Sequence, residues 1–315
     1  MYRPEIKVLD CTIRDGGLMN KWQFSDEFVK AVYHTCVEAG IDYMEVGYKT
    51  SEKYFSKKEY GKWKFCEEED IRSIVGENKT KLKLSVMVDI GRIDPEDILP
   101  RSESIIDMIR IACYVNQVDK AIWLAEYCIN KGYETTINIM AVSTAMERDL
   151  NEALEDINKS RVPIVYLVDS YGSMYCEQVE SLVRKYHERL PGKTIGVHMH
   201  NNMQLAFSNT ITGIIHNCNM LDATFLGIGR GAGNCPIEIL LSFLKNPKFN
   251  LRPVFKFIQD YMLPIKEKID WGYHIPYLIT GAMNEHPRSA IKYMESERKN
   301  DLVAFYDYII DQKHE

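Results

Sequence analysis

The sequence lacks the features that mark membrane, secreted and nucleic-acid-binding proteins. No apolar run approaches the ~20 residues that a membrane span needs, and the stretch from Met1 to Glu5 does not open the apolar core of a secretion signal. Positive charge is not in excess, because 39 Lys and Arg face 45 Asp and Glu, for a formal charge of -6. No global positive field is then available to hold a phosphate backbone. We therefore expect a cytoplasmic protein that binds neither nucleic acid nor a membrane.

Several familiar catalytic and structural motifs are also missing. The eight cysteines form no C-x-x-C pair and no zinc-like spacing, so we expect reduced, mostly buried thiols. There is no Gly-x-Ser-x-Gly elbow, no Walker-type phosphate loop and no His-Glu-x-x-His pattern. What is present is a balance of 45% hydrophobic and 27% charged residues, which is typical of a globular protein.

Eight short runs rich in Val, Ile, Leu and Met recur along the chain and alternate with longer amphipathic segments. This alternation is typical of βα units that build a parallel sheet, and eight units make a (β/α)8 TIM barrel of ~250 residues. An open doubly wound sheet is the competing fold, but its Gly-rich turn and later acid do not follow Cys11. We therefore predict an α/β barrel. Its strands are expected at residues 6–11, 43–46, 82–88, 105–111, 135–140, 163–168, 194–199 and 221–226, with helices at 26–39, 118–131, 150–159, 178–189 and 203–216.

The end of the last βα unit divides the chain in two. Residues 1–244 are expected to form the barrel, and residues 245–315 to form a short helical C-terminal extension. Prolines cannot donate a backbone hydrogen bond, so four of them should break this extension into short helices. They are Pro253, Pro264, Pro276 and Pro287.

Polar side chains stand where the strands end, which is the end of such a barrel that carries chemistry. Arg14 and Asp15 follow the first run and precede two glycines, which we expect to let the backbone turn tightly. His198 and His200 close the seventh run and project to one face, because strand side chains alternate with a period of two. Two imidazoles on one face suit a divalent metal. A hydrogen-bonded histidine pair and a surface Arg–Asp pair are the simpler alternatives.

A glycine-dense loop, residues 227–234, follows the eighth run and ends at Asn234. Its spacing is wrong for a dinucleotide fingerprint, so it either wraps around a ligand or forms only a tight turn. Strands 7, 8 and 1 are consecutive around a closed barrel, so Asp15, His198, His200 and Asn234 should converge. Such a nitrogen and oxygen ligand set suits Mn²⁺, Mg²⁺, Co²⁺, Fe²⁺ or Zn²⁺ and leaves positions for a bidentate substrate.

Taken together, these motifs resemble the HMG-CoA-lyase-like superfamily of metal-dependent aldolases and lyases, the pyruvate carboxyltransferase type of TIM barrel. That superfamily includes 4-hydroxy-2-oxovalerate aldolase, 3-hydroxy-3-methylglutaryl-CoA lyase and the 2-isopropylmalate and homocitrate synthases, and the first type is the most similar. Several spaced motifs in the family order are far more specific than any one motif. The matching segments, within residues 6–244, are Asp10-x-Thr12-x-Arg14-Asp15-Gly16, His198-x-His200-Asn201-Asn202 and Gly233-Asn234.

The resemblance implies a lyase, a class II-type aldolase that cleaves or forms a 4-hydroxy-2-oxo acid from a pyruvate-type enolate and an aldehyde. It implies that Arg14 binds the substrate carbonyl and that Ser170 lines the carboxylate pocket. A metal and an arginine can together hold the negative charge of an enolate beside a 2-oxo acid. The implied ligands of the metal, for which Mn²⁺ comes first and Mg²⁺, Co²⁺ or Zn²⁺ follow, are Asp15, His198, His200 and, as a further candidate, Asn234.

The sequence departs from the aldolase pattern at one place. That aldolase carries a catalytic His shortly after its Arg-Asp-Gly, whereas this chain has Leu18, Met19 and Asn20 there. The base must then be a water molecule on the metal or come from elsewhere. His274 and His286 are candidates if the tail folds back over the barrel mouth, and we favour His286.

Other functions stay open at this point. An acetyl-CoA-dependent Claisen acyltransferase of the isopropylmalate synthase type shares the scaffold, but its acid and amide after Arg-Asp-Gly are replaced by Gly17 and Leu18. A non-catalytic partner of a dehydrogenase is another hypothesis, and an aldolase of this kind is itself a candidate for an aldehyde dehydrogenase partner and for a homo-oligomer. A Schiff-base aldolase would want a lysine in the mouth, where only Lys49 is near. The lysine-rich run at residues 49–64 predicts mainly a solvated face.

Overall fold

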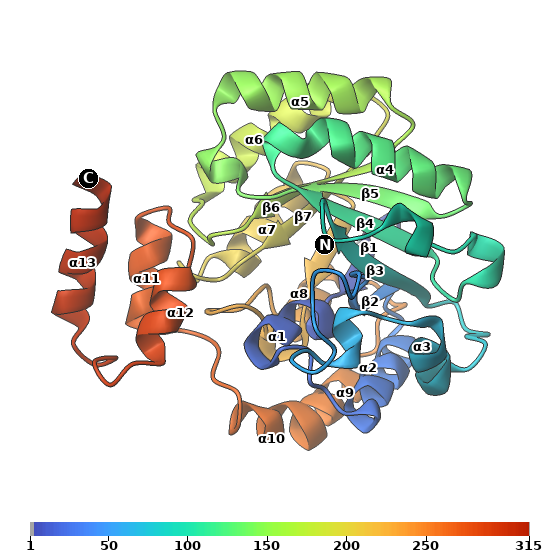
Figure 1. The fold of residues 1–315 in the computed structure, drawn as a ribbon, viewed down its shortest axis with the longest axis horizontal. Coiled ribbons are helices and arrows are strands. Elements are labelled where there is room, and N and C mark those ends of the chain that lie inside the picture. Colours follow the sequence, from blue (N-terminus) through green and yellow to red (C-terminus); the bar gives the residue numbers. More distant parts are fainter. Residues whose placement is uncertain (1–2, 315) are drawn as a thin grey trace.

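The computed structural model describes residues 3–314 and contains a closed barrel of eight parallel strands (Figure 1). Each strand pairs with the next along the chain, and β8 pairs with β1 to close the ring. The predicted TIM barrel is therefore confirmed, and every predicted run overlaps a strand. The strands are β1 Lys7–Asp10, β2 Tyr43–Tyr48, β3 Lys83–Asp89, β4 Met108–Cys113, β5 Glu134–Ile139, β6 Ile164–Asp169, β7 Thr194–Met199 and β8 Met220–Ala223.

Amphipathic helices surround the barrel and bury their apolar faces against it. The first of them shows how the sequence sets its limits: the Ser25 side chain accepts a hydrogen bond from the backbone N–H of Phe28, and Gly40 ends the helix in the left-handed conformation. All five predicted helices are present. The helices of the barrel are α2 Asp26–Ala39, α3 Glu68–Val75, α4 Val118–Asn130, α5 Glu147–Lys159, α6 Cys176–Arg189, α7 Ala206–Ile215 and α8 Ile237–Leu244.

The segment after β1 differs from the prediction. Instead of a glycine turn it forms a helix, α1 (Thr12–Asn20), which contains both glycines. A methyl group on Gly17 would lie 2.1 Å from the Trp22 ring, and one on Gly16 would lie 3.1 Å from the Ile228 side chain. The indole of Trp22 in turn donates to the backbone carbonyl of Arg14 at 2.9 Å. The glycines therefore permit close packing of a helix rather than a tight turn.

The first part of the tail also corrects a prediction. The chain stays helical through α9 (Leu251–Phe257), a π-helical turn at Ile258–Met262 and α10 (Leu263–Lys266), so Pro253 and Pro264 do not break it. Pro253 lies in the first turn, where a backbone N–H needs no partner within the helix. Pro264 follows the π-helical turn, where the helical hydrogen-bond pattern is already shifted.

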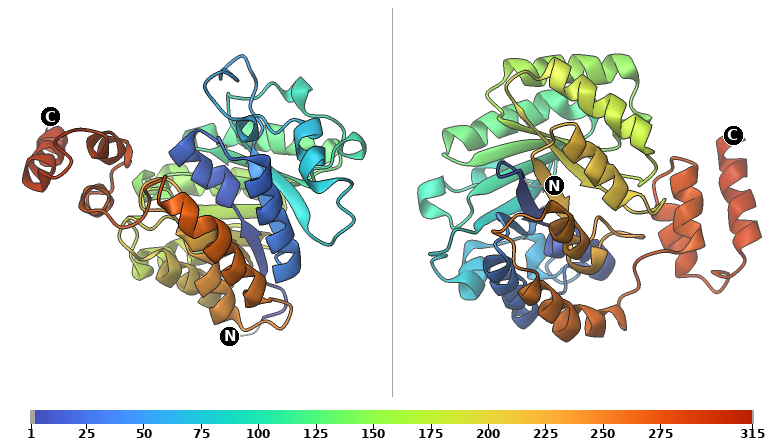
Figure 2. Two further views of the ribbon diagram at one scale, coloured as in Figure 1. Left: turned by 90° about the horizontal axis from the view of Figure 1, so that it is seen from below. Right: turned by 180° about the vertical axis from the view of Figure 1, so that it is seen from behind.

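The last three helices, α11 (Ile275–Ala282), α12 (Arg288–Met294) and α13 (Leu302–His314), form a lobe at one side of the barrel (Figure 1 and Figure 2). Pro276 and Pro287 stand at the beginning of α11 and α12, as predicted. An apolar cluster around Phe305 holds the lobe together and includes Ala232 from the loop after β8. Hydrogen bonds also join the lobe to the barrel, among them one in which the main-chain carbonyl of Tyr277 accepts from Asn202 at 3.3 Å. The division of the chain at residue 244 stays a prediction.

Two smaller expectations concern the surface and the thiols. Among the described residues, no helix is both long enough and apolar enough to cross a membrane. All eight cysteines lie in the described part of the chain and none forms a disulfide there; seven are buried, and Cys176 is exposed.

The packing of α1 makes a matched pair of substitutions informative. Alanine favours a helix over glycine by about 1 kcal/mol, yet Gly17→Ala would drive a methyl group into the Trp22 ring. We expect Gly17→Ala to destabilise the protein by about 1–3 kcal/mol, measured by urea denaturation. Gly16→Ala, which meets only the end of the Ile228 side chain, should cost less. A Gly17→Ala protein as stable as the unchanged one would contradict this account of the glycines.

Candidate active site

A cavity of about 410 Å³ opens at the carboxyl ends of the strands. All eight strands or the loops after them contribute to its lining, and so does the tail, which folds back to this end of the barrel. Asn234 does not line the cavity but contacts Asp15 from behind. The other predicted site residues line this one cavity: Arg14, Asp15, Ser170, His198, His200 and His286.

Asp15, His198 and His200 form a buried cluster whose candidate ligand atoms lie within 4.8 Å of one another. Two atoms there that could ligate a metal are buried without a hydrogen-bond partner among the described residues: Nε2 of His198 and the side-chain carbonyl oxygen of Asn234. The amide nitrogen of Asn234 donates to Asp15 and thereby directs the orphaned oxygen elsewhere. Buried polar atoms without a partner are rare and call for an explanation, which a bound cation provides.

The protonation states also fit a cation. Burial alone would raise the pKa of Asp15, but Arg14 and the two imidazoles outweigh it and hold that pKa well below its ordinary value. Burial lowers the pKa of His200 well below its ordinary value, so this imidazole is neutral. A carboxylate and a neutral imidazole are the forms that bind a metal. These residues therefore fit a divalent metal ion, and the Arg14–Asp15 ion pair is buried rather than on the surface.

A chain of buried charges of alternating sign runs through the barrel interior behind the cluster. At its centre the Arg110 guanidinium contacts Glu45 at 3.0 Å and Asp222 at 2.6 Å. Glu45 accepts from Nε of Arg14 at 2.7 Å, and Arg14 donates to Asp15 at 2.8 Å. At the other end Asp222 lies 2.9 Å from Nδ1 of His198. Both ends of this chain of charges are thus members of the Asp15, His198 and His200 cluster.

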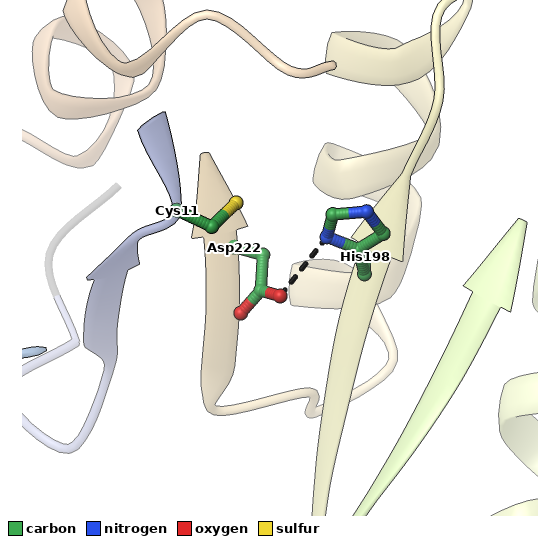
Figure 3. Close-up of side chains that lie close together, drawn as sticks. All are labelled: Cys11, His198 and Asp222. Carbon is green, nitrogen blue, oxygen red and sulfur yellow. Dashed lines mark hydrogen bonds and ion pairs between the residues drawn. The ribbon is translucent and has the colours of Figure 1, made fainter. Parts of the chain in front are cut away.

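A second group of side chains could in principle hold a metal ion: Cys11, His198 and Asp222 (Figure 3). The figure shows Asp222 bound to one ring nitrogen of His198 while the other nitrogen points away. Burial raises the pKa of the Cys11 thiol well above its ordinary value, and this thiol donates to the backbone carbonyl of Ala223 at 3.5 Å. A metal-binding histidine commonly donates its second ring N–H to a carboxylate, which fixes its orientation. We therefore assign Asp222 to orienting His198.

Of the remaining predicted residues, Ser170 and His286 line the cavity, whereas His274 does not. The Ser170 hydroxyl lines the cavity and accepts from the backbone N–H of Ala141 at 2.8 Å. His286 reaches the cavity from the tail, as the prediction requires, but burial and two nearby arginines lower its pKa to about 4. His274 lies outside the cavity lining and pairs with Asp270 at 2.9 Å.

Lys64 is a residue whose setting the sequence did not reveal. It was predicted to lie on a solvated face, but it is buried, with Nζ 4.1 Å from the ring centres of Trp22 and Tyr48 and 4.4 Å from that of Phe55. Burial lowers its pKa to about 8. Tyr48 separates it from the cavity that Tyr48 lines. The signal available in the sequence was its position between two aromatic residues, which is unusual for an exposed lysine.

Residues 5–259 match the model of the HMGL-like family. Among curated relatives, an oxaloacetate decarboxylase of Mycobacterium tuberculosis is 31% identical over 256 residues, which cover 76% of this chain and 69% of that protein. A 4-hydroxy-2-oxovalerate aldolase of Bacillus cereus is 28% identical over 278 residues, which cover 86% of this chain and 80% of that protein.

Solved structures similar to this chain also include an aldolase domain and an HMG-CoA lyase. The N-terminal domain of a candidate aldolase from Bacteroides vulgatus has a TM-score of 0.81 and 31% identity, with 92% of this chain and 97% of that one covered. An HMG-CoA lyase of Bacillus subtilis has a TM-score of 0.69 at 15% identity and covers 86% of this chain and 96% of that one. At that identity the likeness concerns the fold.

The orienting role of Asp222 can be tested by metal binding. Asp222→Asn keeps the shape of the side chain but removes the charge that holds the His198 ring, so we expect Mn²⁺ to bind about 10- to 100-fold more weakly, measured by calorimetry. Asp270→Asn is the matched control, because Asp270 also lies 2.9 Å from a histidine nitrogen but is not part of the cavity lining. Equal Mn²⁺ affinity in the two variants would show that Asp222 does not position His198.

Proposed function

The chain belongs to the HMGL-like family, whose members are metal-dependent lyases and aldolases, and from this premise we propose that it cleaves or forms the C3–C4 bond of a 2-oxo acid. The buried cluster of Asp15, His198 and His200 beside Arg14 carries this proposal. The leading substrate is a 4-hydroxy-2-oxo acid that splits into a pyruvate-type enolate and an aldehyde. The metal, with Mn²⁺ first and Mg²⁺, Co²⁺ or Zn²⁺ as alternatives, would be held by the three cluster residues, with Asn234 as a further donor.

The bound metal would supply Lewis acidity, which lowers the energy of an enolate. The residues around it do the rest. Glu45 and Asp15 engage two of the three nitrogens of Arg14 and so fix the plane of its guanidinium, which leaves the third for a substrate oxygen. A charge-assisted hydrogen bond from Arg14 strengthens as that oxygen gains negative charge. Ser170 would meet the substrate carboxylate at the wall of the same cavity.

Aldol cleavage also requires a group that accepts the proton of the C4 hydroxyl. His286 is the predicted base, and a pKa of about 4 keeps it neutral at pH 7. Its Nδ1 accepts from the backbone N–H of Arg288 at 3.0 Å, and its Nε2 faces a terminal nitrogen of Arg230 at 3.3 Å. A base in this position therefore works only after one ring nitrogen is released from these donors. The role of His286 as base stays a prediction.

Release of CO2 instead of an aldehyde is a second candidate reaction. Its support is the absence of a histidine at Leu18, Met19 and Asn20, because decarboxylation of a 2-oxo acid with a C4 carboxylate removes no hydroxyl proton. Leu18 lines the cavity. The oxaloacetate decarboxylase among the relatives is in line with this candidate. Acyl transfer from acetyl-CoA and a non-catalytic role beside a dehydrogenase remain hypotheses, as do an aldehyde dehydrogenase partner and a homo-oligomer.

Formation of the enolate can be tested without knowledge of the aldehyde. With Mn²⁺ in heavy water, the protein should exchange the methyl protons of pyruvate for deuterons, because the enolate is the shared intermediate of both candidate reactions. Proton NMR should show that a chelator abolishes the exchange and that added Mn²⁺ restores it. Asp15→Asn should slow exchange about 100-fold or more. A metal-loaded protein that leaves pyruvate unchanged would overturn the proposed function.

His286→Ala tests the base and separates the two reactions. Turnover of a 4-hydroxy-2-oxo acid should fall about 100-fold or more, and Mn²⁺ content should stay the same because His286 is no member of the metal cluster. Oxaloacetate decarboxylation should fall much less, since it needs no proton acceptor for a hydroxyl. His274→Ala, outside the cavity lining, is the matched control. Unaltered aldol turnover in His286→Ala would remove this residue as the base.

A further inference from the structure

Arg230 brings a guanidinium without a counter-ion into the cavity. It lies in the glycine-rich loop after β8 and lines the same cavity as Arg14 and Asp15. One terminal nitrogen donates to the backbone carbonyl of Ser170, and its Nε is buried with no partner among the described residues. No described carboxylate lies within ion-pair distance of it.

Two other arginines of the cavity lining have carboxylate partners. The buried Arg14 contacts Asp15 and Glu45, and the exposed Arg92 contacts Asp89 at 3.0 Å. Burial lowers the pKa of Arg230, which is the mark of a cation removed from water. Arg230 is half-buried, and a partly desolvated cation without a carboxylate partner costs free energy, which a ligand of opposite charge in the cavity would offset.

The contact between Arg230 and His286 supports the same conclusion. A neutral imidazole has one acceptor nitrogen, and the backbone N–H of Arg288 occupies Nδ1 at 3.0 Å. Nε2 of the same ring faces a terminal nitrogen of Arg230 at 3.3 Å. The imidazole is neutral, so this contact brings no negative charge to the guanidinium. Arg230 therefore keeps the capacity to donate to an anionic oxygen in the cavity.

The excess of positive charge in the cavity lining also favours an anionic ligand. Its lining contains four arginines but only two aspartates, and a divalent cation on the cluster would add further positive charge. A 2-oxo monocarboxylate supplies a single negative charge, which its own carboxylate brings to the metal and Arg14. A cavity of about 410 Å³ is at the small end for ligand sites. The complementary ligand is thus a small dianion.

We propose that Arg230 binds a second anionic group of the substrate. The inference rests on the proposed function, because the 2-oxo carboxylate is taken to lie at Arg14 and the metal cluster. The second anion belongs to the fragment beyond the C3–C4 bond, so the released aldehyde carries a carboxylate or a phosphate. A C4 carboxylate loses its charge as it leaves as CO2, and a guanidinium bound to it would stabilise the ground state over the transition state.

A matched pair of stable ligands tests this subsite. 2-Oxoglutarate and 2-oxopentanoate share the 2-oxo acid head and the chain length and differ only in the terminal carboxylate. Calorimetry on the Mn²⁺-loaded protein should show 2-oxoglutarate binding about 10- to 100-fold more tightly. Arg230→Met should abolish that preference. Arg148→Met, an exposed arginine on the outer face of α5, should keep it. 2-Oxo-4-phosphonobutanoate distinguishes a phosphate from a carboxylate as the second anionic group of the substrate. It should bind more tightly than 2-oxoglutarate if that group is a phosphate, and less tightly if it is a carboxylate.

Each outcome decides a separate point. Equal affinity for the two ligands in the unchanged protein, or a preference that survives Arg230→Met, would overturn the anion subsite alone. Metal-independent binding, or no binding, of both ligands would overturn the proposed function, and the subsite falls with it. If Arg230→Met does not fold, Arg230→Lys keeps a charge but loses the fork of the guanidinium, and it should retain only part of the preference.

Discussion

The Arg110 guanidinium at the centre of the barrel determines how the catalytic end is arranged. It is fully buried and holds Glu45 and Asp222 on opposite sides. Glu45 then fixes Arg14, and Asp222 fixes His198, so one cation positions two groups that come from different elements, α1 and β7. Buried ion pairs contribute little to stability, because desolvation offsets their attraction. Their contribution here is geometric: without Arg110, two carboxylates would remain buried with like charge and the orientation of both ends would be lost.

Most of the barrel could be predicted from the sequence for a simple reason. The strands of a parallel barrel are buried on both sides and read as continuous apolar runs, such as the one that became β6, so their number and order were visible. Closure of the ring then determined which strand ends meet. The period of two put His198 and His200 on one face, and closure put Asp15 beside them. These inferences depend only on local pattern and topology.

The features that escaped prediction depend on contacts between residues far apart in the chain. Glycines in α1 were taken for a turn because nothing local shows that the Trp22 ring lies against Gly17. Lys64 was taken for a surface residue because its burial arises from three rings supplied by separate segments. Asp222 was hidden in an apolar strand, and its role appears only once Arg110 and His198 are seen on either side of it.

The barrel and the lobe formed by α11 to α13 contribute different parts of the cavity. Arg14 and the three cluster residues, which would handle the enolate, all come from the barrel, whereas His286, Arg288 and Ile291 close the far wall of the cavity from the tail. A single connection, residues 267–274, joins that wall to the rest of the chain. A substitution in the tail can therefore change this wall while Arg14 and the cluster of Asp15, His198 and His200 stay in place. The shape of the cavity and the geometry of the buried cluster thus depend on separate parts of the chain.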